Sequence, residues 1–257
     1  DEFDIPVVGI TGSNGKTMVK EWLYQLLSPS MVVTRSPRSY NSQVGVPLSV
    51  WLMNEQTQVG VFEAGISQPG EMQALRDIIQ PTIGILTNLG PAHQENFPSM
   101  AAKCKEKLTL FHDTQAVVYC QDDELVNRCM SEFAYHGEQL AWSVKNDKAA
   151  FFVKSIEKKD ITTTVTYVYN GKTEGRYSIP FIDEASVTNS IVSAIAALYL
   201  GITTGQLAER MAKLEPVAMR LEVKEGQHGC TLINDSYNSD INSLDIALDF
   251  MSRRPDH

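Results

Sequence analysis

Apolar runs of strand length alternate with helical periodicity through the first half of the chain. Residues 5–10, IPVVGI, form one such run, and the apolar residues of 19–27 then recur at intervals of three and four. Further strands are predicted at 31–34, 59–65, 82–88 and 116–120, and further helices at 71–79, 99–111 and 123–133. This alternation is typical of the α/β class, in which a parallel sheet is flanked by helices.

The pattern changes between residues 149 and 180, where β-branched and aromatic residues dominate. Strands are predicted there at 151–156, 162–169 and 175–180. The dipeptide Asn170-Gly171 is a favoured hairpin turn between two of these strands. We therefore expect a small antiparallel β subsheet in this part of the chain.

The end of the chain predicts the start of a further α/β domain. Helices are predicted at 187–200 and 204–214, followed by strands at 220–223 and 231–233 and a helix at 241–251. The 38 residues from 220 to 257 are too few for an independent domain of the usual ~100 residues. We therefore divide the chain into 1–219 and 220–257, and the absence of an initiator methionine indicates a segment of a longer protein.

The composition is that of a soluble globular protein, with 43% hydrophobic and 21% charged residues among 257. A net charge of −9 argues against a nucleic-acid partner, which usually requires a basic surface. The longest apolar stretch, residues 191–202, is shorter than the ~20 residues of a membrane-spanning helix. The four cysteines lack the CxxC spacing of a zinc site, which favours reduced thiols in a cytoplasmic protein.

A phosphate-binding loop is the strongest chemical signal in the sequence. Residues 11–17, TGSNGKT, lie between a predicted strand and an amphipathic helix, which is the context that such a loop requires. Lys16 can reach terminal phosphates, and the Thr17 hydroxyl can ligate Mg²⁺. The strict pattern has a glycine where this chain has Ile10, so the loop is a variant. The residues that we expect to bind nucleotide here are Gly12, Ser13, Asn14, Gly15, Lys16 and Thr17.

Four motifs, taken together, resemble those of the Mur ligase family of ATP-dependent amide ligases. TGSNGKT is similar to the family's ATP loop, and SYNSQVGVP, FEAGISQPGEM and TNLGPAHQENF are similar to three further motifs in the expected order. The residues at matching positions are Asn41, Gly45, Pro47, Glu63, Asn88 and His93. The resemblance implies that Asn41 contacts the substrate and that Asn88 supports the nucleotide.

Within the family, residues 232–243, LINDSYNSDINS, resemble members that add D-alanyl-D-alanine to UDP-N-acetylmuramoyl-tripeptide. The stretch from 234 to 250 also resembles ligases that are fused to an alanine racemase. The resemblance therefore implies two small-molecule partners, a UDP-sugar peptide and D-alanyl-D-alanine.

Two Mg²⁺ ions are implied by the resemblance, one held by Thr17 and Glu63 and a second by His93. The sequence itself places Glu63 and His93 after two predicted strands, and ligands of parallel sheets gather at the carboxyl ends of strands. Without the resemblance, the sequence favours a cap or surface acid for Glu63 and, for His93, a loop histidine bonded to the backbone. Because Mg²⁺ prefers oxygen ligands, one histidine is tolerable only beside phosphate oxygens and water.

Lys107 stands out among three lysines in the predicted helix at 99–111. At ~100° per residue it falls within the apolar face of that helix, whereas Lys105 points away. Burial lowers the pKa of a lysine and favours the free amine. The family carries a carbamylated lysine that braces the second metal, and the family spacing from His93 leads to Lys107 as well. The alternative is a lysine whose stem covers apolar surface while its charge reaches water.

Asn189 matches the second asparagine of the family's HNxxNALAA helix, which reads the adenine edge. The alternative is that Asn189 caps the helix predicted at 187–200. Ala185 and Ser186 replace the family's histidine and first asparagine, so the contacts made from those two positions are not expected here.

The remaining nucleotide residues lie at the start of the second predicted domain. Arg220 matches the arginine that reaches the phosphates, although Met219 replaces the usual glycine. Asp235 and Tyr237 match the residues that hold ribose and base, and Asn238 is a candidate turn cap.

The implied reaction activates a precursor carboxylate with the γ-phosphate of ATP, and an amine then attacks the acyl phosphate. Lys16, Lys107 and Arg220 are the catalytic candidates. Lys16 and Arg220 would offset negative charge, and the resemblance implies that Lys107 braces the second metal as a carbamate. The alternatives are another Mur ligase, a folate polyglutamylating ligase, or a P-loop module that binds nucleotide without ligase chemistry. The last needs no second metal, so the set Glu63, His93 and Lys107 argues against it. We expect a cytoplasmic monomer with no nucleic-acid or membrane partner.

Overall fold

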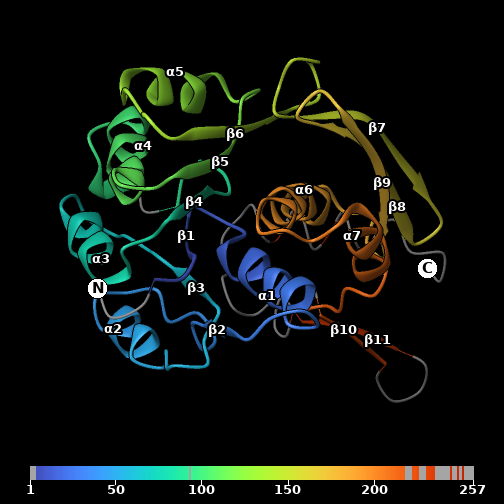
Figure 1. The fold of residues 1–257 in the computed structure, drawn as a ribbon, viewed down its shortest axis with the longest axis horizontal. Helices are drawn as coiled ribbons and strands as arrows, with labels where there is room; N and C mark the ends of the chain where they lie inside the picture. The colour runs from blue at the N-terminus through green and yellow to red at the C-terminus, as the bar shows by residue number, and fades with distance from the viewer. Residues whose placement is uncertain are drawn as a thin grey trace.

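The computed structural model describes residues 4–92, 94–217, 222–225 and 230–234, together with residues 244, 248 and 251. Within them, nine strands form one sheet in the order β2-β3-β1-β4-β5-β6-β7-β8-β9 (Figure 1). The strands are β1 (Val7–Thr11), β2 (Val33–Arg35), β3 (Val59–Glu63), β4 (Ile83–Leu86), β5 (Ala116–Cys120), β6 (Glu138–Ser143), β7 (Phe151–Lys159), β8 (Thr162–Tyr169) and β9 (Thr173–Ile179).

The strands from β2 to β7 pair in parallel, with β1 lying between β3 and β4. Val8 and Ile10 of β1 belong to one hydrophobic core and Val7 to the other, so this strand is covered on both faces. The register places Ile10 beside Glu63 of β3, and Thr11 beside Leu86 of β4. The carboxyl ends of three neighbouring strands therefore meet at one edge of the sheet. The predicted parallel sheet is confirmed.

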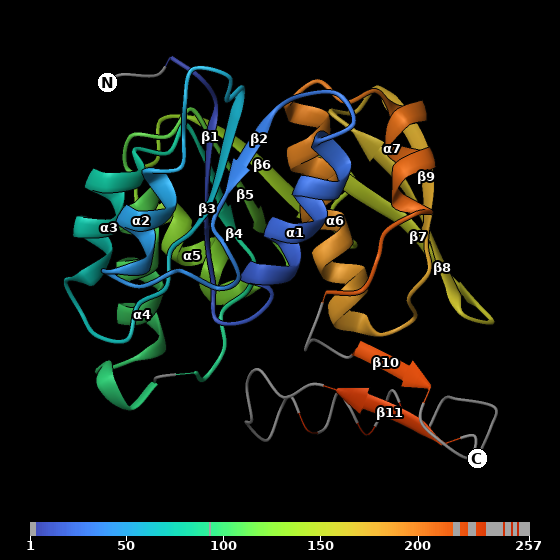
Figure 2. The ribbon, with the colours of Figure 1, turned by 90° about the horizontal axis from the view of Figure 1, so that it is seen from below.

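Helices cover both faces of the sheet (Figures 1 and 2). On one face, α1, α6 and α7 supply the apolar side chains of one core, and on the other α2, α3, α4 and α5 supply those of the second. The helices are α1 (Lys16–Leu27), α2 (Gly45–Val50), α3 (Glu71–Ile79), α4 (Met100–Leu108), α5 (Glu124–Glu132), α6 (Glu184–Tyr199) and α7 (Thr204–Met211), with short 3₁₀ turns η1 (Gln94–Asn96) and η2 (Thr109–Phe111).

The antiparallel part of the sheet is formed by β7, β8 and β9, as predicted. Asn170 and Gly171 both have positive φ angles, 51° and 66°, which the predicted two-residue hairpin turn requires. This part is nevertheless an extension of the main sheet, because β7 also pairs in parallel with β6. Figure 1 shows these strands curving around α6 and α7.

A separate two-stranded antiparallel sheet, β10 (Glu222–Glu225) and β11 (Thr231–Asn234), follows α7 (Figure 2). These are the two strands predicted after residue 219. Leu244, Leu248 and Met251 are helical, in agreement with the helix predicted at 241–251. The division into domains at residues 219 and 220 stays a prediction.

Candidate functional site

The TGSNGKT segment connects the end of β1 to the start of α1, at the edge where the carboxyl ends of β3 and β4 also lie. Gly12 has a φ of 144°, and a Cβ at this position would overlap the Thr87 hydroxyl. Gly15 has a φ of 82°, and a Cβ there would overlap the Asn189 side-chain oxygen. Both glycines are therefore required by the backbone conformation and by close packing.

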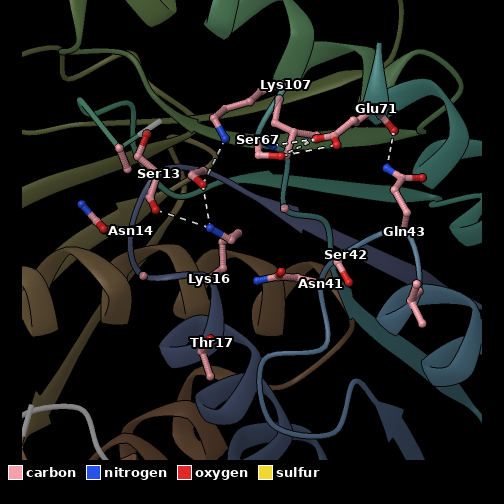
Figure 3. A pocket seen from close by; sticks show the side chains of 16 residues that line it. Ser13, Asn14, Lys16, Thr17, Asn41, Ser42, Gln43, Ser67, Glu71 and Lys107 are labelled. Atoms are coloured by element: carbon pink, nitrogen blue, oxygen red, sulfur yellow. Dashed lines mark hydrogen bonds between the residues drawn. The ribbon is translucent and has the colours of Figure 1, made fainter. Parts of the chain in front are cut away.

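The first turn of α1 faces a cavity with a volume of about 380 Å³ (Figure 3). Gly15 is the N-cap of this helix and offers no side chain to accept from the first-turn N–H groups. A helix N-terminus of this kind is an anion-binding site, because its N–H groups lack partners within the helix. The cavity is lined by Gly12, Ser13, Asn14, Gly15, Lys16, Thr17, Asn41, Ser42, Gln43, Val44, Gly65, Ile66, Ser67, Glu71, Ala92 and Lys107.

Two lysines from different elements converge on the carbonyl oxygen of Gly12 (Figure 3). Lys16 Nζ of α1 lies 2.9 Å from this oxygen, and Lys107 Nζ of α4 lies 3.2 Å from it. Lys16 Nζ also donates to the Ser13 carbonyl at 3.4 Å. The two lysines place positive charge at the cavity whenever they are protonated, although the whole chain carries a net charge of −9. This arrangement suits the phosphates of a nucleotide.

Lys107 is buried, with 3% of its surface exposed, whereas the Lys105 side chain is 58% exposed and pairs with Glu132. The predicted orientation of the two lysines is confirmed, and the alternative of a lysine whose charge reaches water is wrong. Burial, together with the positive charges of Lys16 and Lys103, lowers the pKa of Lys107 to about 7. A substantial fraction of Lys107 is therefore the free amine near neutral pH.

The loop after β4 forms hydrogen bonds with the phosphate loop. The Ser13 N–H donates to the Asn88 carbonyl at 3.1 Å, and the Asn14 N–H donates to Asn88 Oδ1 at 2.9 Å. Ser13 Oγ donates to the Gly90 carbonyl at 3.0 Å. Asn88 therefore shapes the loop through its backbone and its side chain.

Lys103 was not among the sequence candidates, yet it is buried beside this supporting loop. Its Nζ donates to the carbonyl oxygens of Gly90, at 2.6 Å, and Ala92. Burial lowers the pKa of Lys103, and the nearby Glu95 carboxylate opposes this shift. Lys103 lies close to the apolar face of the predicted helix, and this position could have indicated its burial.

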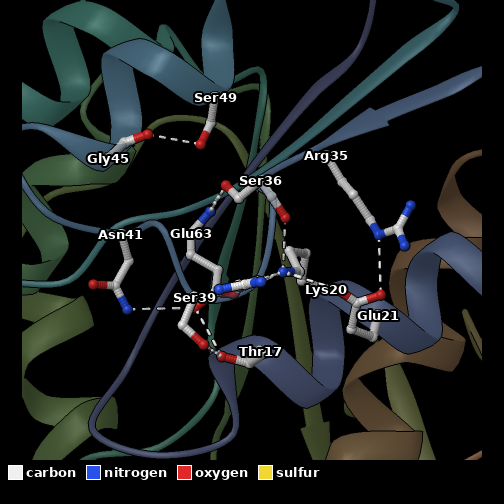
Figure 4. Close-up of polar contacts among 11 residues, drawn as sticks. Thr17, Lys20, Glu21, Arg35, Ser36, Ser39, Asn41, Gly45, Ser49 and Glu63 are labelled. Atoms are coloured by element: carbon white, nitrogen blue, oxygen red, sulfur yellow. Dashed lines mark hydrogen bonds and ion pairs between the residues drawn. The ribbon is translucent and has the colours of Figure 1, made fainter. Parts of the chain in front are cut away.

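Glu63 ends β3, is fully buried and faces Thr17 at the start of α1 (Figure 4). Its Oε2 accepts from Thr17 Oγ1 at 3.1 Å and from Asn41 Nδ2 at 3.5 Å. The structure thus brings together the predicted metal ligands Thr17 and Glu63 and the predicted substrate residue Asn41. Because Glu63 is buried inside this group, the alternatives of a helix cap and a surface acid are wrong.

The donor set around Glu63 fits a hard divalent cation. Glu63 Oε1 is buried and has no hydrogen-bond partner, and Thr17 offers a hydroxyl oxygen next to the same carboxylate. In the described part of the chain, no three His, Cys, Asp or Glu side chains lie together as a complete metal site. A cation here would therefore take further ligands from phosphate and water, which suits Mg²⁺.

Lys20 was also missed by the sequence analysis. It lies fully buried in α1 and pairs with Glu63 Oε1 at 3.2 Å and with Glu21 Oε1 at 2.9 Å. At ~100° per residue Lys20 falls within about 20° of Leu27, at the border of the apolar face of this helix. The argument that identified Lys107 could therefore have identified Lys20.

Asn189 lies within α6, buried against Gly15 of the phosphate loop. The helix begins earlier than predicted, at Glu184, and its N-cap is Asp183, whose carboxylate accepts from the Ser186 N–H at 2.7 Å. The alternative of Asn189 as a helix cap is therefore wrong. Its position beside the phosphate loop is compatible with a nucleotide contact, which stays a prediction.

The remaining predicted site residues lie outside the described residues. They are His93, Arg220, Asp235 and Tyr237, together with the turn candidate Asn238. The described helices are all too short or too polar to cross a membrane. All four cysteines lie in the described part of the chain, and no disulfide joins any of them.

Comparison with known proteins identifies relatives over almost the whole chain. Residues 10–197 match the model of the Mur ligase middle domain. The chain is 30% identical over 243 residues to the UDP-N-acetylmuramoyl-tripeptide–D-alanyl-D-alanine ligase of Borreliella burgdorferi, covering 92% of this chain and 50% of that protein. It is 26% identical over 250 residues to the ligase of the same name from Bacillus subtilis, covering 96% of this chain and 53% of that protein.

Solved structures show the same fold. The crystal structure of MurF from Acinetobacter baumannii superposes with a TM-score of 0.86 at 23% identity, over 97% of this chain and 55% of that one. MurF from Thermotoga maritima, solved in complex with ADP, superposes with a TM-score of 0.83 at 24% identity, over 98% of this chain and 58% of that one. The chain thus spans about half the length of the relatives that it matches.

Proposed function

The chain belongs to the Mur ligase family, and we propose that it supplies the ATP-binding site of a ligase that adds D-alanyl-D-alanine to UDP-N-acetylmuramoyl-tripeptide. The main observation in support is the convergence of Lys16 and Lys107 on the Gly12 carbonyl, close to the N-terminus of α1. The buried Glu63 contacts Thr17 in the first turn of the same helix. The curated relatives named above, which carry this activity in their names, support the choice of substrates. The product would enter peptidoglycan precursor synthesis in the cytoplasm.

The phosphates of ATP would lie in the cavity at the first turn of α1. Backbone N–H groups of residues 15–17 would bind phosphate oxygens, and Lys16 would turn from the loop carbonyls toward the γ-phosphate. Asn189 would contact the nucleotide from α6, and Arg220, Asp235 and Tyr237 would hold its phosphates, ribose and base. The glycines would let the backbone approach the phosphates closely.

The reaction needs no side-chain nucleophile. A carboxylate oxygen of the tripeptide attacks the γ-phosphorus, the bond to ADP breaks, and an acyl phosphate forms. The amine of D-alanyl-D-alanine then attacks the acyl carbon, loses a proton and expels phosphate, which leaves an amide. Lys16 and Arg220 would offset the negative charge that develops on the transferring group, and Asn41 would orient the substrate at the mouth of the cavity.

Thr17 and Glu63 are the residues that would hold one Mg²⁺, and His93 would hold a second beside a carbamylated Lys107. Bound Mg²⁺ would neutralise phosphate charge and orient the reacting oxygens. The free amine of Lys107 can combine with CO₂ to give a carbamate and a proton. The resulting negative charge would be stabilised by Lys16 and Lys103, the two lysines that disfavour the protonated amine.

Carbamylation can be tested by ¹³C NMR of the chain in ¹³C-bicarbonate. We expect a carbamate resonance that grows as the pH rises through about 7, because only the free amine reacts. The resonance should vanish in Lys107→Met and persist in Lys105→Met, the matched control on the exposed face of α4. Absence of the resonance from the wild-type chain at mildly alkaline pH would contradict the assignment of a carbamate to Lys107. Persistence of the same resonance in Lys107→Met would contradict it as well.

The ligase activity can be tested with a chimera in which this chain replaces the matching half of the Bacillus subtilis relative. We expect the purified chimera to form UDP-N-acetylmuramoyl-pentapeptide from the tripeptide, D-alanyl-D-alanine, Mg²⁺ and ATP, detected by mass spectrometry. The same chimera with Lys16→Ala should form none. A chimera that binds ADP but forms no pentapeptide would instead favour another amino-acid ligase, a folate-type ligase or a nucleotide-binding module.

We also propose that the ligase works as a monomer on small-molecule substrates. The fusion to an alanine racemase stays a prediction.

A further inference from the structure

Lys20 is a buried cation that holds groups from three elements together (Figure 4). It lies one helical turn after Thr17, on the helix that begins at the phosphate loop. Its Nζ donates to the carbonyl oxygens of Ser36, at 2.8 Å, and Arg38, both in the segment after β2. It also pairs with the carboxylates of Glu21 and Glu63.

Of the four contacts of Lys20 Nζ, those with Ser36 and Arg38 are hydrogen bonds, and those with Glu21 and Glu63 are ion pairs. An ammonium group has three N–H donors, whereas four oxygen atoms surround Lys20 Nζ. Glu63 Oε1 lies 3.2 Å from Nζ, yet no donor is aligned with it for a hydrogen bond. Lys20 therefore attracts this oxygen by charge while its N–H groups are directed at other acceptors.

The segment after β2 is fixed to Glu63 from its other side. Ser36 Oγ accepts from the Glu63 N–H at 3.2 Å, and Asn41 Nδ2 donates to Glu63 Oε2 at 3.5 Å. Ser39 Oγ lies 3.0 Å from the Thr17 hydroxyl. Residues 36–41 thus link Lys20, Glu63 and Thr17 into one network.

We propose that Lys20 is a positioning residue of the magnesium site, which holds the Glu63 carboxylate and residues 36–41 where Glu63 and Thr17 can share one cation. This inference rests on the proposed function, in which Mg²⁺ is bound by those two residues. Groups that orient a metal ligand contribute to metal affinity without touching the metal. A buried lysine cannot withdraw to water, so its partners are held in one arrangement.

A purely electrostatic role for Lys20 would have the opposite consequence. Removing the positive charge of Lys20 would remove its repulsion of a cation bound at Glu63, and cation binding would become stronger. Positioning, by contrast, makes the cation site weaker when Lys20 is lost. The sign of the change in Mg²⁺ requirement therefore separates the two roles.

The experiment is a calorimetric titration of the chain with ADP over a series of Mg²⁺ concentrations, with EDTA as the metal-free reference. We expect Lys20→Met to raise the Mg²⁺ concentration for half-maximal enhancement of ADP binding by about tenfold to a hundredfold. Glu21→Gln is the matched control, because it removes the carboxylate that faces away from the metal site, and its Mg²⁺ requirement should stay near that of the wild type.

An unchanged or lowered Mg²⁺ requirement in folded Lys20→Met would overturn the inference. If circular dichroism shows that Lys20→Met does not fold, Lys20→Arg decides, since it keeps the charge but directs its donors differently. We expect its Mg²⁺ requirement to rise in the same direction, and a wild-type value would overturn the inference. A wild-type chain whose ADP binding does not respond to Mg²⁺ would instead refute the proposed metal site itself.

Discussion

The buried charge of Lys107 lowers the free energy of unfolding, and the size of this effect depends on pH. Its pKa is about 7 in the folded chain, against an ordinary value of 10.5, so the unfolded chain binds more protons between these values. Stability therefore rises with pH across this window, and the full penalty applies below about pH 7. Without CO₂, we expect Lys107→Met to raise the free energy of unfolding more at about pH 6 than at about pH 9, as measured by urea denaturation.

Lys105→Met is the control for this prediction. Lys105 is exposed, and its partner Glu132 raises its pKa, so it stays protonated in both states over the same pH range. Its substitution should change stability equally at the two pH values. An equal gain for Lys107→Met at both pH values would show that Lys107 is not a buried amine with a lowered pKa.

A site residue could be predicted from the sequence when its type and its local pattern were enough to indicate its role. Lys107 was predicted from its place on an apolar helix face, and its burial is confirmed. Glu63 and Asn41 are 22 residues apart, and their contact was not predicted, because no local pattern brings them together. Lys20 was missed because its role depends on carbonyl oxygens of residues 36 and 38, which no local pattern brings to the helix.

At the scale of elements, the N-terminus of α3 is completed by a side chain from α4. Gly70 is the N-cap of α3 and has no side chain, and Glu106 Oε1 accepts from the N–H groups of Gly70 and Met72 at 2.9 and 3.1 Å. The carboxylate also complements the positive end of the helix dipole. This contact joins the helix that carries Lys107 to the start of α3, where Glu71 lines the cavity.

We expect Glu106→Ala to lower the free energy of unfolding by about 1–2 kcal/mol, the usual range for a lost N-cap. Glu106→Gln should lose less, because its amide oxygen can still accept. Chemical denaturation of both variants, with the exposed Glu55→Ala as a control, measures the effect. A loss in Glu55→Ala as large as that in Glu106→Ala would remove the basis for assigning a capping role.

Helices and strands with strong hydrophobic periodicity were predicted well. Short elements and strands that begin with polar residues were not. The helix at 71–79 has the predicted bounds. The six-residue α2 contains Gly45 and Pro47 and is too short to show a helical period. β6 begins with the exposed Glu138 and Gln139, so its apolar run is too short to be recognised. Missing β6 hid the connection between the parallel and antiparallel parts of the sheet.

At the scale of the whole molecule, the chain contains the proposed phosphate site but spans about half the length of its curated relatives. Substrates in such ligases must be brought into line with the γ-phosphate, and this proximity accounts for much of the rate. We expect the isolated chain to form no detectable pentapeptide from tripeptide, D-alanyl-D-alanine, Mg²⁺ and ATP, and to hydrolyse ATP slowly. The full-length Bacillus subtilis relative is the positive control, and comparable product from both would contradict the expectation.

Binding of nucleotide at the α1 N-terminus is the central claim, and calorimetry with Mg²⁺ and ADP tests it most directly. We expect one ADP per chain, and Lys16→Ala should weaken binding by about 2–3 kcal/mol, or roughly 30- to 150-fold, because a charge-assisted contact to phosphate is lost. Lys213→Ala, on the exposed surface of the chain, should bind as the wild type does. An absence of binding by the wild-type chain, or equal affinity in a folded Lys16→Ala variant, would contradict the assignment of this cavity as a nucleotide site.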